Sequence, residues 1–203
     1  MNKLLLIGSG GHASACIDVI EAQNQFKIGG LIEKPGHKLI SNCGYDIIGS
    51  DKDLKKLREK FKYALVSVGQ LKSPSTRIML YELLKKYDYT SPKIISPYAY
   101  VSKHASVGEG SIVMHGAIVN ANSVIGKNCI INNKALIEHD ATVNNFCHIS
   151  TGSIINGGVT VGQETFVGSG AITKQYISIG EKCIIGAGIF VKENIKPNRV
   201  IKF

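Results

Sequence analysis

A six-residue repeat constrains this chain more than any other feature of its sequence. From residue 95 onward the same register can be followed through seventeen positions, and sixteen of them carry Val or Ile. The positions are Ile95, Val101, Val107, Val113, Val119, Ile125, Ile131, Ile137, Val143, Ile149, Ile155, Val161, Val167, Thr173, Ile179, Ile185 and Val191. A fixed short period predicts a solenoid, in which each repeat adds one strand to a parallel β-helix.

A second column of small residues follows the first at an offset of four. It reads Ala99, Ala105, Ser111, Ala117, Ser123, Cys129, Ala135, Ala141, Cys147 and Ser153. Cys129 and Cys147 fall in this column, and Cys183 continues it, so we interpret all three as inward space-fillers rather than nucleophiles. The five cysteines form no C-x-x-C pair, which favours reduced thiols over a disulfide framework.

The first part of the chain has a different pattern. Apolar strand-like runs at 3–8, 27–33 and 63–69 alternate with helical periods at 13–23, 53–60 and 77–87. This alternation predicts a small α/β unit with a parallel sheet. Pro92 and Pro97, each preceded by Ser, interrupt the pattern. We therefore expect a Rossmann-like domain over residues 1–92 and the β-helix over 93–203.

Charge and hydropathy exclude several classes of protein. The net charge is +9, but the lysines are spread along the chain without a nucleic-acid-binding motif, so an anionic small ligand is the better interpretation. The apolar run near the N-terminus is four residues long before glycines interrupt it. That run is too short for a membrane span and has no signal-peptide pattern, which predicts a cytoplasmic protein.

The six-residue repeat resembles that of the hexapeptide acyltransferases, whose coil is a left-handed triangular prism of eighteen residues. Stepping by eighteen then gives three outward columns. The first is Ile112, Ile130, His148, Phe166 and Ile184; the second is Ile118, Leu136, Ile154, Ile172 and Phe190; the third is Val124, Thr142, Thr160, Ser178 and Lys196. Because two columns are apolar, we expect other copies of the chain to cover those faces in a closed ring.

Two histidines are candidates for acyl-transfer chemistry. His139 follows Glu138 and precedes Asp140, and His148 interrupts an apolar column. A neutral histidine is a suitable base for an attacking amine or hydroxyl, with either carboxylate as its partner. His148 could hydrogen-bond a thioester carbonyl. The two histidines are half a coil apart, so they would meet one small group only across an interface between copies.

Four motifs together narrow the resemblance. They are G-x-G-G-H at 8–12, V-G at 68–69, I-E-H-D at 137–140 and the histidine nine residues after His139. This order resembles the sugar O- and N-acetyltransferases of the sialic-acid and bacillosamine pathways. The resemblance implies acetyl-CoA as donor and a homotrimer with active sites between subunits. It assigns His139 as general base, Asp140 as its acidic partner, His148 as an acetyl-CoA contact, Asn132 near the acceptor, and Gly157, Ser169 and Ala187 along the pantetheine groove.

The N-terminal glycines lie where a strand end would open a helix, a place that favours phosphate. By the same resemblance, Gly10, Gly11 and His12 approach the phosphates or sugar of a nucleotide sugar, Glu33 and Lys34 hold the base or ribose, and Gly69 closes the pocket. A dinucleotide is the alternative ligand. Arg77 is either part of this site or a solvated charge. Two departures from the family pattern are Lys134, where a small hydroxyl residue is usual, and a tail that lacks G-x-P-A-K.

These observations favour an N-acetyltransferase that acts on a nucleotide-linked 4-amino-4,6-dideoxy sugar in bacterial glycan biosynthesis. The alternative is O-acetylation of a sialic-acid-like sugar, which would use the same base and donor. A zinc carbonic anhydrase would need three metal ligands, and His115, His139 and His148 have the wrong column relations, so we expect no metal. A non-catalytic nucleotide-sugar sensor would have no use for the intact E-H-D segment.

Overall fold

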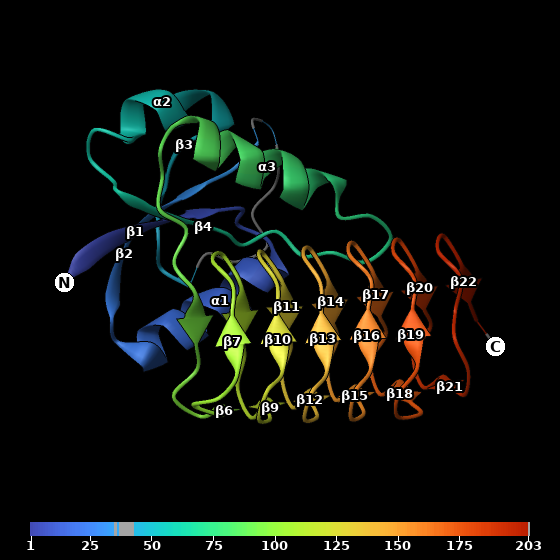
Figure 1. Cartoon of the computed structure of the whole chain (residues 1–203). Helices are drawn as coiled ribbons and strands as arrows, with labels where there is room; N and C mark the ends of the chain where they lie inside the picture. The colour runs from blue at the N-terminus through green and yellow to red at the C-terminus, as the bar shows by residue number, and fades with distance from the viewer. Residues whose placement is uncertain (35, 37–42, 203) are drawn as a thin grey trace. The chain divides into compact units, whose positions relative to one another are not determined.

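The computed structural model describes residues 1–34, 36 and 43–202. It forms two compact units. One comprises residues 1–69 and 75–94, and the other comprises residues 70–74 together with the chain from residue 95 onward (Figure 1). The short segment 70–74 thus groups with the repeat region, which the sequence pattern did not indicate. Among the residues that the structure describes, none of the helices has the length and apolar character that a membrane crossing requires.

The first unit is built on a four-stranded parallel sheet in the order β3-β2-β1-β4, as the alternating pattern predicts. Its elements are β1 (Asn2–Ile7), α1 (Gly11–Gln23), β2 (Phe26–Ile32), β3 (Ile47–Gly49), the 3₁₀ helix η1 (Asp51–Asp53), α2 (Leu54–Leu57), β4 (Tyr63–Val66) and α3 (Ser75–Lys86). The last four residues of β1 are buried, as expected for a strand between two neighbours. The carboxyl ends of these strands carry the loops that form the site described below.

Two local features of this unit differ from the sequence-based prediction. The helix expected over 53–60 is instead η1 followed by the single turn α2, because Ser50 and Asp53 form a capping box that starts the helix earlier. Arg77 is 1% exposed, and its Nη1 donates to the carbonyl oxygens of Val66 at 3.1 Å and Val68 at 2.5 Å. The solvated-charge interpretation of Arg77 is therefore wrong, since the guanidinium holds the backbone where β4 ends.

The second unit is a left-handed parallel β-helix of three sheets, which confirms the fold that the repeat indicates. The first face comprises β5 (Ile94–Ile95), β8 (Ile112–Val113), β11 (Ile130–Ile131), β14 (His148–Ile149), β17 (Phe166–Val167), β20 (Ile184–Ile185) and β22 (Val200–Ile201). The second face comprises β6 (Tyr100–Val101), β9 (Ile118–Val119), β12 (Leu136–Ile137), β15 (Ile154–Ile155), β18 (Ile172–Thr173) and β21 (Phe190–Val191). The third face comprises β7 (Ser106–Val107), β10 (Val124–Ile125), β13 (Thr142–Val143), β16 (Thr160–Val161) and β19 (Ser178–Ile179).

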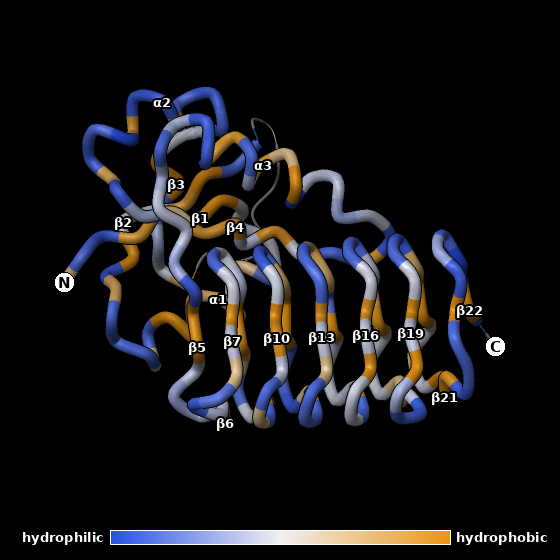
Figure 2. The backbone as a smooth tube through the Cα atoms, in the orientation of Figure 1, coloured by the Kyte–Doolittle hydropathy of each residue, from blue (hydrophilic) through white to orange (hydrophobic). Residues whose placement is uncertain are grey.

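The interior of this β-helix is a column of aliphatic residues, which Figure 2 shows as orange bands at the same point of successive coils. Val143, Ile149 and Ile155 are completely buried, and so are Cys129 and Cys147. The interpretation of these cysteines as inward space-fillers is confirmed, and Cys183 is buried in the same core. Truncating one of the large aliphatic residues to Ala would cost roughly 2–5 kcal/mol.

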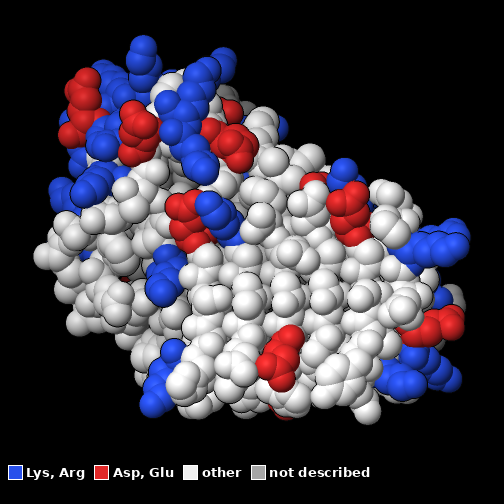
Figure 3. Space-filling model, viewed as in Figure 1, with Lys and Arg blue, Asp and Glu red and all other residues white. Residues whose placement is uncertain are grey.

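The three outward faces differ in what covers them. On the first face Ile112, Ile130 and His148 are at most 5% exposed, and segment 70–74 lies against the later coils. At His148 and the later coils, this segment of the chain takes part of the place that we expected another copy to cover. The second face is apolar and partly exposed, whereas the third is polar and, between its corners, almost free of charged residues (Figure 3).

Candidate active site

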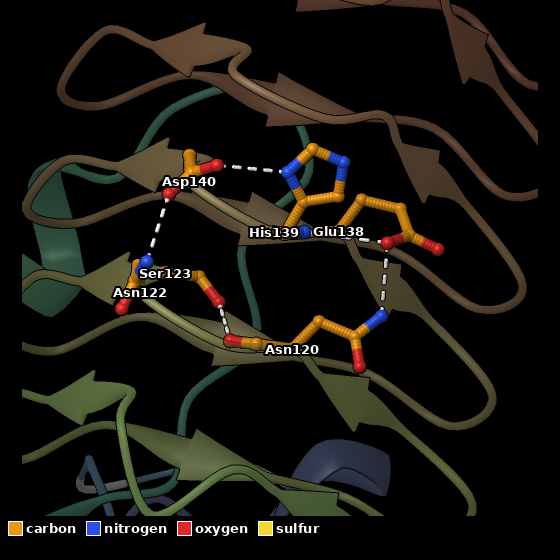
Figure 4. Close-up of polar contacts among 6 residues, drawn as sticks. All are labelled: Asn120, Asn122, Ser123, Glu138, His139 and Asp140. Atoms are coloured by element: carbon orange, nitrogen blue, oxygen red, sulfur yellow. Dashed lines mark hydrogen bonds and ion pairs between the residues drawn. The ribbon is translucent and has the colours of Figure 1, made fainter.

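The corner between the second and third faces, here called the second corner, carries His139 and Asp140 (Figure 4). The Nδ1–H of His139 donates to Oδ2 of Asp140 at 2.8 Å. Oδ1 of Asp140 accepts from Nδ2 of Asn122 at 3.1 Å, so a residue one coil earlier holds the carboxylate. Because Nδ1 is engaged, the Nε2 atom of a neutral ring carries the lone pair. The pair has the arrangement of a general base and its orienting acid.

Glu138 has a different function from Asp140. Its Oε2 accepts from Nδ2 of Asn120 at 2.9 Å and from the backbone N–H of His139 at 3.3 Å. The backbone carbonyl of Asn120 accepts a hydrogen bond from the hydroxyl of Ser123, which holds Asn120 in place. Glu138 therefore supports the backbone of the corner, while Asp140 orients the ring. From the sequence alone, either carboxylate could have been the partner of His139.

The electrostatics of this pair favour a stronger base. The hydrogen bond that His139 donates to Asp140 raises the pKa of His139 above its ordinary value; burial opposes this rise, and the charges of Asp140 and Glu138 add to it. The same hydrogen bond, with that from Asn122, lowers the pKa of Asp140. The two side chains are 54% and 55% exposed, so solvent reaches both. Asp140 thus stays ionised across the range in which His139 gains or loses its proton.

An open cavity of about 490 Å³ lies beside Nε2 of His139. Its lining comprises Glu138, His139, Asn156, Gly157, Gln175 and Tyr176. A Cβ atom at Gly157 would lie 2.7 Å from Nε2 of His139, so the ring occupies the space that a side chain there would fill. Gly158 gives the same room to the ring of Tyr176, since a Cβ there would lie 2.4 Å from it. Gly157 was predicted as a coenzyme contact, and in the structure it makes room for the ring of His139.

His148 lies on the first face, away from His139 in the chain's own coil. Its Nδ1–H donates to the carbonyl oxygen of Gln70 at 2.6 Å, and its Nε2 faces Nδ2 of Asn132 at 3.1 Å. Oδ1 of Asn132 accepts from the backbone N–H of Asn133, which fixes the amide so that Nδ2 is the donor. His148 is therefore the neutral tautomer with its proton on Nδ1. Phe166 meets the ring edge-on at 5.2 Å.

The predicted coenzyme contacts divide between two corners. Gly157 lies at the second corner with His139, whereas Ser169 and Ala187 lie on successive coils at the corner between the first and second faces, here called the first corner. Ser169 bonds the hydroxyl of Ser150 at 2.9 Å. Three consecutive coils carry only small residues at the first corner, namely Ser150, Thr151, Gly152, Gly168, Ser169, Gly170, Gly186, Ala187 and Gly188. These residues form a strip without large side chains along the first corner.

The first unit contains a cavity of about 380 Å³ at the carboxyl ends of its strands. It is lined by all six residues predicted here: Gly10, Gly11, His12, Glu33, Lys34 and Gly69. A Cβ atom at Gly10 or Gly11 would meet nothing within 4 Å, so the open space in front of the N-terminus of α1 admits a ligand to the backbone. Gly8 differs, because its φ of 114° and the close Val68 side chain require glycine for the fold itself.

Several lining residues were missed by the sequence analysis. Asp51 and Thr76 belong to the cavity of the first unit, and Gln175 and Tyr176 to that beside His139. Gln175 and Tyr176 stand eighteen residues after Gly157 and Gly158, so the coil period could have found them. Asp51 had no comparable signal, because the short strand β3 that precedes it was not predicted.

The histidines are distributed over separate places. His115 bonds the hydroxyl of Ser96 at 2.6 Å, and both ring nitrogens of His148 face the partners given above. Within the described part of the chain, no group of three or more His, Cys, Asp or Glu side chains could hold a metal ion.

Comparison with known proteins agrees with this architecture. Residues 3–84 match the family model described as the PglD N-terminal domain. No curated protein sequence gives a significant match. A histidine-to-asparagine mutant of perosamine N-acetyltransferase from Caulobacter crescentus, solved with CoA and GDP-perosamine, is 29% identical, with a TM-score of 0.91 over 98% of this chain and 93% of that chain.

The acetyltransferase domain of PglB from Neisseria gonorrhoeae FA1090 is 30% identical, with a TM-score of 0.87 over 96% of this chain and 93% of that chain. Its complex with acetyl coenzyme A superimposes with a TM-score of 0.89 at 29% identity, over 98% of this chain and 96% of that chain. Both units of the chain are thus shared with these relatives. The chain belongs to the hexapeptide-repeat family of acetyl-CoA-dependent sugar acetyltransferases that includes the sialic-acid O-acetyltransferases and the bacillosamine N-acetyltransferases.

Proposed function

We propose that this protein transfers an acetyl group from acetyl-CoA to the amine of a nucleotide-linked 4-amino-4,6-dideoxy sugar. The observation that carries the proposal is the pair formed by His139 and Asp140, with Nε2 of His139 beside an open cavity. Support for the acceptor comes from perosamine N-acetyltransferase, whose solved complex contains CoA and GDP-perosamine. Bacterial glycan biosynthesis is the process in which such a product would be used.

In this mechanism Nε2 of His139 accepts a proton from the acceptor amine as the nitrogen attacks the thioester carbonyl carbon. The new C–N bond replaces the C–S bond, and the thiolate leaves and takes up a proton. Asp140 keeps the ring oriented and stabilises its protonated form. The raised pKa of His139 increases its affinity for the proton that it must remove. Acetyl-CoA supplies only the acetyl group. The protein supplies the base, and it binds and orients the two substrates.

We further propose that the active unit is a homotrimer, in which the second corner of one copy faces the first corner of the next. Two features support this. The second face, which joins these corners, exposes Ile118, Ile172 and Phe190 by 39%, 38% and 54%. Such an apolar stripe is costly to leave in water. An interface there would bring His139 of one copy near the small-residue strip and the Asn132–His148 pair of its neighbour.

The residues at the first corner suit the coenzyme better than the acceptor. Asn132 and His148 hold each other in one arrangement, so they present a rigid wall beside the small-residue strip. Since Nε2 of His148 accepts from Asn132, it does not offer a proton to a thioester carbonyl in this state. We therefore assign His148 to shaping the wall, and Asn132, which it orients, to contact with the bound substrates.

The experiment incubates the full chain with acetyl-CoA and a panel of UDP- and GDP-linked 4-amino sugars and free sialic acids, and follows thiol release. We expect release with one amino sugar, and a fall of about 10²–10⁴ in kcat for His139→Ala. Mass spectrometry of the product should show an added acetyl group on nitrogen. Release with sialic acids alone would move the chemistry to oxygen, and release unaffected by His139→Ala would remove His139 as base.

A further inference from the structure

Three carboxylates lie at or next to the cavity of the first unit, and they differ in what binds them. Oε2 of Glu33 accepts from the backbone N–H of Ser9 at 3.0 Å and from its hydroxyl at 2.6 Å, and Oε1 accepts from the backbone N–H of Lys34 at 2.8 Å. Oδ2 of Asp53 accepts from the backbone N–H and hydroxyl of Ser50, both at 2.8 Å. Both carboxylates are therefore committed to the local fold.

Asp51 is the exception. It lines the cavity, it is partly exposed, and its carboxylate makes no hydrogen bond or ion pair with any residue that the structure describes. The capping box that starts η1 uses Ser50 and Asp53, so Asp51 is not needed to close it. An unpaired carboxylate beside a site for an anionic diphosphate is unfavourable unless hydrogen-bond donors of the ligand reach it. Both oxygens of Asp51 are available for such donors.

The strand order determines which part of a nucleotide would lie there. The glycine loop follows β1, Glu33 follows β2, and Asp51 lies two residues after the end of β3, in a sheet of order β3-β2-β1-β4. Neighbouring strands are about 4.8 Å apart, so the end of β3 is about 10 Å from the end of β1. Diphosphate at the glycine loop places the ribose near the end of β2, which is the general arrangement in Rossmann-type folds. The base then extends toward β3 and Asp51.

We propose that Asp51 binds the base of the nucleotide sugar and selects guanine. The inference rests on the proposed function, because it takes the cavity as the nucleotide site. Guanine presents N1–H and the 2-amino group side by side, and these two donors match the two oxygens of a carboxylate. Uracil offers a single N–H between two carbonyl oxygens, which a carboxylate repels. In adenine and cytosine a ring acceptor stands next to the amino group, so neither base offers a pair of adjacent donors.

The test is calorimetric titration of the full chain with GDP, inosine diphosphate and UDP. We expect GDP to bind about tenfold to a hundredfold more tightly than UDP, as for a bidentate contact to one base. Inosine diphosphate lacks the 2-amino group and should fall between them. Asp51→Asn should bring GDP and UDP to within about threefold of each other, because its amide donor opposes one guanine N–H. Asp53→Asn, a neighbouring carboxylate outside the cavity, should retain the preference.

The outcomes separate this inference from the function on which it rests. UDP binding as tightly as GDP, or a GDP preference that survives in Asp51→Asn, would overturn base selection by Asp51 and leave the nucleotide site intact. Failure of all three diphosphates to bind the wild-type chain, at concentrations where acetyl-CoA turnover is measured, would instead overturn the nucleotide cavity and this inference together. The comparison of GDP with UDP on the wild-type chain needs no variant, so it does not depend on how Asp51→Asn folds.

Discussion

His139 and Asp140 are consecutive in the chain, yet Nδ1 of one lies 2.8 Å from Oδ2 of the other. Neighbouring residues of an extended strand point to opposite sides, so this contact needs an unusual backbone. Asp140 has a φ of 59°, in the left-handed region that Asp tolerates better than most residues. Its backbone N–H donates to the carbonyl of Ala121 on the previous coil, which closes the corner. The turn of the β-helix thus brings the carboxylate of Asp140 within hydrogen-bond distance of the imidazole ring of His139.

Asp140→Asn should change the pH dependence of turnover. His139 acts as a base only when neutral, so kcat rises with pH through its pKa. Asp140 raises that pKa, and replacing it with Asn should therefore move the acid limb of the profile to lower pH. The plateau of kcat should fall by about tenfold or more, because the protonated ring loses its counter-charge.

Glu138→Gln is the matched control for this change. Glu138 acts on the pKa of His139 only through its charge, and this is the smallest of the four effects on that pKa. The acid limb of the Glu138→Gln profile should therefore move much less. The measurement is kcat against pH for the wild type and both variants. An acid limb that stays in place in Asp140→Asn would mean that the group titrating in the profile is not His139.

Gly157→Ala tests the space that His139 occupies. The added methyl group would lie 2.7 Å from Nε2, closer than carbon and nitrogen approach, so the ring has to rotate away. A displacement of about 1 Å at a catalytic group costs about 10²-fold in rate. We expect kcat to fall by that order while the melting temperature changes little, because the ring is half exposed and free to move.

The alternative for Gly157 is a coenzyme contact alone. In that case the variant would raise KM for acetyl-CoA and leave kcat unchanged. Steady-state kinetics with acetyl-CoA varied at saturating acceptor separates the two, and the pKa of His139 from NMR titration reports whether the ring has left Asp140.

The β-helix was predictable because its repeat is strictly local. Each Val or Ile at the sixth position is followed by a turn to the next face, so the stacked coils bury Val143 and Ile149 in one interior column. The N-terminal cavity was also predictable, since strand ends gather Gly10 and Glu33 at one edge of a parallel sheet. These parts depend on short-range patterns alone.

The partners of individual side chains were not predictable in the same way. Gln70 and His148 are 78 residues apart, and no period connects them. The contact of segment 70–74 with the first face could therefore not be predicted from the repeat. Glu138 and Asp140 are equally close to His139 in sequence, and only the left-handed φ of Asp140 decides between them. Arg77 had the pattern of an exposed helical residue, but it is buried because the carbonyls of Val66 and Val68 need donors.

The thiols should react in two classes. Cys43 is exposed, whereas Cys16, Cys129, Cys147 and Cys183 are buried. Burial raises the pKa of Cys16 to about 12 and that of Cys147 well above its ordinary value, which keeps both as unreactive thiols. A disulfide reagent should therefore modify one thiol quickly in the native protein and the remaining four only after unfolding in urea. Cys43→Ser should abolish the fast phase, and a fast phase that persists in it would show that a core cysteine is accessible.

The trimer can be tested with one charge on each of two faces. Ile172 lies on the second face and Val124 on the third, with 38% and 46% of their surfaces exposed in the single chain. If the second face is the interface, Ile172→Glu buries an unpaired charge there and should convert the trimer to monomers, while Val124→Glu remains in solvent and should not.

Light scattering after size exclusion measures the mass of each variant, and thiol release measures its activity. Because the proposed site needs His139 from one copy and the first corner from the next, the Ile172→Glu monomer should bind GDP but lose turnover. A wild-type chain that is monomeric and active would contradict the shared site, and an Ile172→Glu trimer with full activity would exclude the second face as the interface.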